Sequence, residues 1–127
     1  MLGAIALGIA GVAVPGSAAI AQTSAESAVV ERFWVFENDN FGGGRKSYTG
    51  TDRNFENDEW DGTSRSVSDG TSSVDNNTSR FVVLYANRAE PGETNCTGGQ
   101  YTSQPWTADS DLSNNNFDNR ADCAVFR

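Results

Sequence analysis

The sequence has no histidine, only two cysteines and few basic residues, and each shortage excludes a class of function. Without histidine, neither a Ser-His-Asp triad nor a Cys-His pair can form, so the usual nucleophilic enzymes are excluded. Two sulfur atoms and no imidazole also argue against a zinc site. Nine Lys and Arg residues stand against 17 Asp and Glu residues, and the resulting net charge of −8 disfavours nucleic acids and anionic membranes as partners.

Two patterns that can accompany catalysis remain, and both are better explained as loops. Four acidic residues between positions 56 and 61 could supply a glycosidase pair, but they share one short polar stretch that is typical of a solvated face. The glycines at 42–44 follow a strand pattern but have no helix pattern after them, unlike a phosphate-binding loop. We therefore expect a protein that is not an enzyme.

Charge is also missing from the N-terminal segment, in which the first charged residue is Glu26. Residues 1–21 are mostly Ala, Gly, Ile, Leu and Val and end on a small-x-small pattern, which is typical of a signal peptide cleaved after Ala21. We expect a secreted, extracellular protein with a linker at 22–32 and no membrane segment after cleavage. No basic region precedes the apolar run, so an internal start at Met1 and a retained apolar anchor stay open as alternatives.

The rest of the chain consists of short strand patterns separated by turn residues. Residues 33–36 form an aromatic and β-branched run, Asn and Gly residues follow at 38–44, and residues 45–49 return as a second strand. No window shows sustained helical periodicity, so any helix should be a single turn within a loop. The expected core consists of Phe33 or Trp34, Phe36, Phe41, Tyr48, Val67, Val74, Val82, Leu84, Tyr101, Trp106, Phe117 and Val125.

These strand and turn patterns occur twice. Residues 34–36 match 83–85, residues 40–44 match 95–99, and residues 69–73 match 119–123, which makes an internal repeat of about 50 residues. A repeat of a few short strands cannot bury its apolar face alone. We therefore expect both copies to pack face to face in one domain over 33–127, with the first copy at 33–79 and the second at 80–127.

The repeated motifs resemble those of a known family. Residues 36–43, Phe-Glu-Asn-Asp-Asn-Phe-Gly-Gly, resemble the hairpin of βγ-crystallin Greek-key motifs. The hexapeptides 68–73 and 118–123 resemble the signature through which many members bind calcium. The chain is most similar to the secreted bacterial peptidase inhibitor family I36, whose fold is a single βγ-crystallin domain. The resemblance implies an all-β fold, a βγ-crystallin-type sandwich of two Greek-key motifs, in a monomer.

The resemblance also implies calcium binding at the two signatures, through roughly six to eight oxygen ligands for each ion. The implied ligands are Glu37, Asp69, Gly70, Ser72, Asp118, Asn119, Arg120 and Asp122, with the backbone carbonyl serving at Gly70 and Arg120. The sequence departs from the family pattern at Ser68, which replaces Asn or Asp, and at Ala86, which replaces a hairpin Glu. The alternative is that the signature side chains only cap turns by bonding to the backbone.

The two cysteines fall at matching points of the repeat. Cys96 takes the position of Phe41 and Cys123 takes that of Ser73, and the resemblance places this hairpin beside this serine. In an exported chain we expect these cysteines to form a disulfide, with two free thiols as the alternative.

Function then falls in the binding class, with three hypotheses. The first is a protease inhibitor like the I36 members, which presents an ordered loop to a secreted metalloprotease. The candidate inhibitory loop is Arg88, Ala89, Glu90, Pro91, Gly92, Glu93 and Thr94, although an ordinary tolerated insertion explains it equally well. The second is a calcium-stabilised extracellular structural module without inhibitory activity. The third is a toxin-like antimicrobial domain, for which this acidic chain lacks the usual cationic face.

Overall fold

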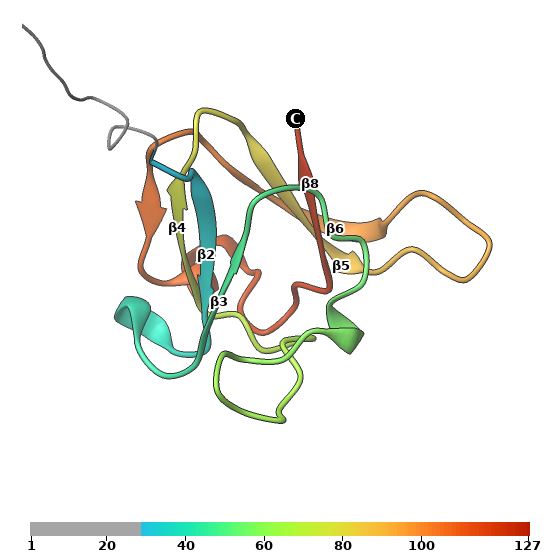
Figure 1. Cartoon of the computed structure of the whole chain (residues 1–127), viewed down its shortest axis with the longest axis horizontal. Helices are drawn as coiled ribbons and strands as arrows, with labels where there is room; N and C mark the ends of the chain where they lie inside the picture. The colour runs from blue at the N-terminus through green and yellow to red at the C-terminus, as the bar shows by residue number, and fades with distance from the viewer. Residues whose placement is uncertain (1–28) are drawn as a thin grey trace, which may run out of the picture. The chain divides into compact units, whose positions relative to one another are not determined.

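The computed structural model describes residues 29–127, so the predicted signal peptide and most of the predicted linker lie outside the described residues. The described part forms two antiparallel sheets (Figure 1). The strands of the first sheet are, in spatial order, β3 (Arg45–Tyr48), β2 (Arg32–Phe36), β4 (Ser73–Asn77) and β7 (Ala108–Asp109). Those of the second are β6 (Thr97–Ser103), β5 (Val82–Asn87) and β8 (Cys123–Phe126). The prediction of an all-β fold is confirmed.

The helices of the described residues are single turns within loops, as the sequence predicts. They are the 3-10 helices η3 (Asp39–Phe41), η4 (Phe55–Asn57) and η5 (Leu112–Asn115). In residues 29–127, no helix has the length and apolar character needed to cross a membrane.

Each sheet takes a segment from the other repeat. Strand β7 comes from the second repeat but pairs with β4, with Val74 opposite Asp109. In the other direction, Asp52 of the first repeat forms an isolated antiparallel bridge with Ala124 of β8. Because of this exchange, the two repeats are joined by backbone hydrogen bonds as well as by side-chain packing.

The core lies between the sheets and follows the alternation of strand residues. In β2, Phe33 and Val35 are fully buried, whereas Trp34 and Phe36 lie half-buried on the other face. Phe33 meets Phe126 of β8 edge-on, with ring centroids 6.4 Å apart. The remaining buried members of the main cluster are Tyr48, Phe55, Trp60, Val67, Val74, Val82, Leu84, Leu112, Phe117, Ala121 and Ala124.

Most of the predicted core is confirmed, but Phe36 of β2 is only half-buried on the other face of its sheet, and two further errors fall in turns. Phe41 and Trp106 are 42% and 61% exposed, so their prediction as core residues was wrong. Both lie in turns with positive φ, 61° and 59°, an uncommon conformation for bulky residues, and the Phe41 ring meets the half-buried Phe36 ring, edge-on at 5.6 Å. Conversely, Phe55 and Trp60 are buried although they belong to a polar stretch, and the Phe55 ring stacks on Tyr48 at 4.9 Å.

Candidate functional site

The two signature hexapeptides lie side by side and bond to each other reciprocally. The Asp69 amide donates to the Ala121 carbonyl at 3.0 Å, and the Asn119 amide donates to the Thr71 carbonyl at 2.9 Å. Asp69 and Asn119 occupy matching repeat positions, and both have a φ of 56°. Asn and Asp adopt this left-handed conformation more readily than other side-chain-bearing residues. The local backbone therefore follows from the residue types that the signature requires.

This arrangement sets the fifth position of each hexapeptide near the second position of the other. The Ser72 hydroxyl donates to Oδ1 of Asn119 at 3.3 Å. At the matching place, Asp122 and Asp69 line one hollow of about 380 Å³, which we call the signature hollow. Its full lining is Glu56, Asp69, Ala86, Asn87, Arg88, Glu90, Thr97 and Asp122.

Buried side-chain oxygens without a hydrogen-bond partner are concentrated in these hexapeptides. Within residues 29–127, the buried side-chain oxygen and nitrogen atoms without a partner are Thr71 Oγ1, Asp118 Oδ1 and Asp122 Oδ1. Asp122 is only 6% exposed and lines the signature hollow. A buried carboxylate oxygen without a partner is costly, so a cluster of such atoms indicates a place for a cation or ordered water.

The ionised form of Asp122 is disfavoured in this environment. Burial raises the pKa of Asp122, as do the charges of Asp69 and Glu56, and the Ser68 hydroxyl and the Arg88 guanidinium offset only part of this rise. Burial and the charge of Glu56 likewise raise the pKa of Asp69. A divalent cation among these carboxylates would relieve both the desolvation and the repulsion.

The first hairpin also carries negative charge toward the signatures. Desolvation and the charges of Asp111 and Asp118 raise the pKa of Asp39. Asp118 contributes one of the unpartnered oxygens, Oδ1, and its Oδ2 accepts from the Asn119 amide group at 3.3 Å. Carboxylates therefore lie close to one another where the first hairpin meets the second signature.

A guanidinium group occupies the equivalent place in the second repeat. A Cβ on Gly43 would lie 2.6 Å from Nδ2 of Asn38, and a Cβ on Gly98 would lie 2.7 Å from Nδ2 of Asn87. Both glycines have positive φ, so the two hairpins pack their asparagines in the same way. The residue that follows is Asp39 in the first hairpin and Arg88 in the second.

Arg88 is held among the acidic groups of the signature hollow. Its Nε lies 2.9 Å from Oε2 of Glu56, and its Nη2 lies 3.8 Å from Oε1 of Glu90. Its charge also lowers the pKa of Asp122. The sequence predicts Arg88 only as part of an inhibitory loop, and no linear motif indicates that its side chain supplies positive charge to the signature hollow.

The other predicted ligands are placed less favourably. The Glu37 carboxylate pairs with Arg65 and accepts from the Gly44 amide at 3.0 Å, and these contacts lower the pKa of Glu37. At Arg120 the predicted ligand is the backbone carbonyl, because the guanidinium has no acceptor; the guanidinium donates to the Asn116 carbonyl at 2.9 Å. A calcium ion that used the Glu37 side chain would have to displace Arg65.

No three carboxylate or thiol groups of residues 29–127 converge closely enough to hold a metal by themselves. A cation at the signatures would therefore need carbonyl, hydroxyl and amide oxygens in addition to one or two carboxylates. Calcium accepts such mixed sets, whereas most transition metals do not favour them. The donor set present here fits calcium.

The structure contains the predicted disulfide between Cys96 and Cys123, with Cα atoms 6.5 Å apart. The same connection in the first repeat is made by hydrogen bonds. The Phe41 amide donates to Oγ of Ser73 at 3.0 Å, and that hydroxyl donates to the Asn38 carbonyl at 2.7 Å.

The predicted inhibitory loop projects from the body between β5 and β6 (Figure 1). It is anchored at its base by the Ala89 amide, which donates to the Arg53 carbonyl at 3.0 Å, and by the disulfide at Cys96. Its tip contains a tight turn in which the Glu93 amide donates to the Glu90 carbonyl at 2.9 Å. The tip is exposed and the base is held.

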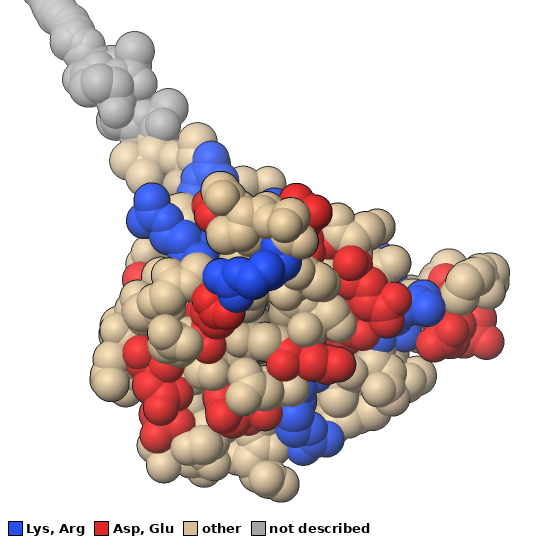
Figure 2. Space-filling view, turned by 90° about the horizontal axis from the view of Figure 1, so that it is seen from below, with Lys and Arg blue, Asp and Glu red and all other residues tan. Residues whose placement is uncertain are grey.

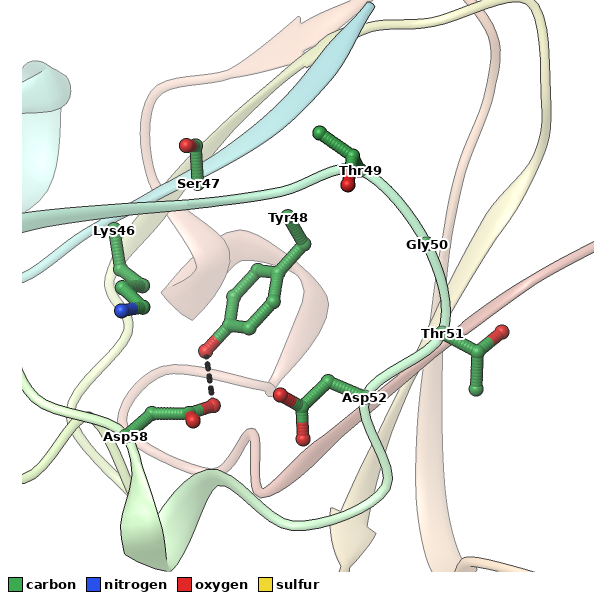
Figure 3. Close-up of a pocket in the computed structure, with 8 residues that line it drawn as sticks. All are labelled: Lys46, Ser47, Tyr48, Thr49, Gly50, Thr51, Asp52 and Asp58. Atoms are coloured by element: carbon green, nitrogen blue, oxygen red, sulfur yellow. Dashed lines mark hydrogen bonds between the residues drawn. The ribbon is translucent and has the colours of Figure 1, made fainter.

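A further hollow of about 390 Å³ lies beside β3 (Figure 3). Tyr48 directs its hydroxyl to Oδ2 of Asp58 at 2.8 Å, with Asp52 on the other side. Burial raises the pKa of Asp58; repulsion from Asp52 adds to the rise, and the hydrogen bond from Tyr48 and the charge of Lys46 oppose it. The sequence predicts only a solvated acidic stretch here. It does not predict the contact between Tyr48 and Asp58, because folding brings these two residues together.

No known protein-family profile matches the chain, and no curated protein matches its sequence. Several solved structures share its fold, among them two βγ-crystallin domains. One, from work on the evolution of the eye lens βγ-crystallin domain fold, has a TM-score of 0.62 and 16% identity over 76% of this chain and 84% of its own. The other, a βγ-crystallin from an archaeon, has a TM-score of 0.59 and 17% identity over 78% of this chain and 100% of its own. These likenesses confirm the predicted βγ-crystallin fold.

Proposed function

We propose that this βγ-crystallin-fold domain is a secreted, non-enzymatic protein that binds calcium between its two signature hexapeptides and is stabilised by it. The observation that carries the proposal is the position of the three unpartnered buried oxygens, all of which lie in these hexapeptides. A ligand that binds only the folded state raises stability by about 2.7 kcal/mol when its concentration is 100 times Kd.

The residues divide into two sets related by the repeat. The first comprises the Gly70 carbonyl, the Ser72 hydroxyl and the side chain of Asn119, with Asp118 beside it. The second comprises the Arg120 carbonyl and the carboxylates of Asp122 and Asp69. Calcium supplies positive charge at these oxygens and no reaction. We expect the first set to bind more tightly, because Arg88 already supplies charge to the second.

The test is thermal unfolding of the oxidised protein in EDTA and in millimolar calcium. Calcium should raise the unfolding temperature, Asp122→Asn should reduce this rise, and Asp122→Asn combined with Ser72→Ala should abolish it. In EDTA, Asp122→Asn should unfold at the same or a higher temperature, since it removes a buried charge with an unpartnered oxygen.

Asp61→Asn is the matched control, because it removes one negative charge from an exposed residue outside both sets. The calcium-induced rise should be retained in this variant. No rise in the unaltered protein, or an equal rise in the double variant, would reject calcium binding at the signatures.

Secretion is proposed from the predicted signal peptide, and the disulfide supports it. Disulfides persist in oxidising compartments outside the cytosol. Extracellular modules also commonly bind calcium with Kd values of about 10⁻⁴–10⁻³ M. Measuring the redox state of Cys96 and Cys123 and the fate of residues 1–21 in the native host would test this part of the proposal.

A second candidate function is inhibition of a metalloprotease, as in the I36 family, by a monomer. The observation that favours it is the loop at 88–94, which projects beyond the body and is anchored at both ends. An anchored loop loses less conformational entropy on entering a cleft. Titration of the protein against a thermolysin-type zinc protease tests this function. Inhibition that is lost when residues 90–93 are replaced by a two-residue turn supports the candidate. If the unaltered protein does not inhibit the protease, the candidate is rejected for this protease type.

The toxin-like alternative receives no support from the surface. Acidic side chains spread over the face in Figure 2, with basic side chains interspersed among them. Membrane attack by an amphipathic surface usually requires a strongly cationic face.

A further inference from the structure

A hollow whose lining contains no Asp or Glu side chain lies beside the disulfide, although the chain carries a net charge of −8. We call it the arginine hollow. Its volume is about 360 Å³, and its lining is Arg53, Tyr85, Asn95, Cys96, Gln100, Val125 and Arg127. Apart from the apolar surface of Cys96, Val125 and the tyrosine ring, these side chains carry groups that can donate hydrogen bonds.

The charges of the two arginines are not compensated by ion pairs. In residues 29–127, the arginines that form ion pairs are Arg65 and Arg88. Nη2 of Arg127 donates to the Tyr85 hydroxyl at 2.9 Å, a neutral partner that orients the guanidinium and leaves its charge free. Arg53 and Arg127 line the same hollow, so an anion bound there would meet positive charge from both residues.

The frame around these groups is well anchored. Tyr85 of β5 pairs with Gln100 of β6 on one side and with Cys123 of β8 on the other. The Arg53 carbonyl accepts from the Ala89 amide at 3.0 Å, which fixes the Arg53 backbone at the loop base. Donors from a strand pair and a pinned loop can therefore converge on one ligand with little loss of backbone entropy.

A main-chain oxygen of Arg127 already has a cationic partner. It accepts from Nε of Arg80 at 3.2 Å, and the Arg127 amide donates to the Phe81 carbonyl at 2.8 Å. The main chain at Arg127 is thus bound to the segment before β5, while the Arg127 side chain lines the arginine hollow.

We infer that the arginine hollow is a binding site for a small oxyanion, a class that includes phosphate, sulfate and the carboxylate at the end of a peptide. Guanidinium groups bind such oxygens through paired, charge-assisted hydrogen bonds. The amides of Asn95 and Gln100 can add neutral donors that fix the orientation of the anion. This site is separate in residues and in charge from the signature hollow.

The test is a titration of the ¹⁵N-labelled, oxidised protein, stripped of calcium with EDTA that is then dialysed away, at constant ionic strength, with chloride exchanged for sodium phosphate, and then for sulfate. We expect saturable shifts of the amides of Tyr85, Cys96 and Gln100. Arg53→Gln and Arg127→Gln should each weaken binding by at least about tenfold, because each removes charge-assisted hydrogen bonds. Arg53→Lys should retain part of the affinity.

Arg32→Gln is the matched control, since Arg32 is exposed on β2, away from the arginine hollow, and its guanidinium donates to the Ser47 hydroxyl at 3.0 Å. It changes the net charge equally and should leave binding unchanged. A short peptide with a free terminal carboxylate, compared with its amidated twin, distinguishes a peptide end from a free inorganic anion. Unsaturable shifts, or equal losses in Arg32→Gln and Arg53→Gln, would overturn the inference. The amide spectrum of each variant verifies that it is folded, and the calcium-free buffer keeps the result independent of calcium.

Discussion

In the first repeat, the Ser73 hydroxyl joins β4 to the preceding hairpin, whereas in the second repeat a disulfide makes the equivalent connection. Ser73 is fully buried, accepts from the Phe41 amide and donates to the Asn38 carbonyl. Cys123 is also fully buried, and it bonds covalently to Cys96 at the position equivalent to Phe41. The fold requires that hairpin and strand be held together here, and either kind of bond satisfies the requirement.

The repeats differ in charge as well as in closure. In the first, the fifth signature residue is the neutral Ser72 and the hairpin carries Asp39; in the second, the fifth residue is Asp122 and the hairpin carries Arg88. The negative charge therefore lies on the hairpin in the first repeat and on the signature in the second. In the second repeat, the Arg88 guanidinium lies near the buried Asp122 carboxylate. The comparison shows that the second repeat places a guanidinium group near its buried signature carboxylate, whereas the first repeat has a carboxylate at the matching hairpin position.

The largest expected effect is the loss of stability when the Cys96–Cys123 disulfide is removed. Replacing both Cys96 and Cys123 by Ala should lower the free energy of unfolding by about 3–4 kcal/mol, because the bridge closes a separation of 27 residues. Chemical denaturation of the oxidised protein and of the double variant measures this difference. An effect of less than about 1 kcal/mol would show that the unfolded chain is already restrained near this turn.

The hydrogen bonds of the Ser73 hydroxyl, which make the equivalent connection in the first repeat, should contribute less to stability. Ser73→Ala removes a donor and an acceptor from a fully buried position and should cost about 1–2 kcal/mol. The same denaturation experiment measures it, with exposed Ser64→Ala as the control. If Ser73→Ala costs as much as the loss of the disulfide, the two connections do not differ in strength as their bond types predict.

The third prediction concerns the Arg88 guanidinium in the signature hollow. Arg88→Ala should strengthen calcium binding at the second set by about tenfold, since calcium would no longer compete with a guanidinium, and should destabilise the calcium-free protein. Calorimetric titration of the variant, alongside Arg32→Ala as a charge-matched control, tests both effects. Unchanged affinity would mean that Arg88 pairs with Glu56 without opposing a metal.

Much of this arrangement could be predicted from the sequence because it depends on local residue types. Asn and Gly residues indicate the hairpins, and the matching hexapeptides and cysteines predict the repeat and the disulfide. The position of Arg88 could not be predicted, since it depends on how an inserted loop leaves β5. The burial of Phe55 and Trp60 depends in the same way on contacts with distant segments, such as the stacking of Phe55 on Tyr48.

The smallest expected effect is on the pH dependence of stability. The pKa values of Asp58, Asp69 and Asp122 are raised above the ordinary value of 3.8, so the folded state binds protons before the unfolded state does. In EDTA, stability should therefore rise as pH falls from 7 through these raised pKa values, and the gain should end near 3.8. Glu37 opposes this trend at lower pH, because its pKa is lowered from 4.5 and its ion pair is lost on protonation.

Calcium competes with protons for the signature carboxylates, so in millimolar calcium the rise in stability should shrink or reverse. Unfolding temperatures measured from pH 7 to 4, with and without calcium, test this sign. A fall with decreasing pH in EDTA would mean that the carboxylates are already well compensated, and the case for a cation at the signatures would fail with it.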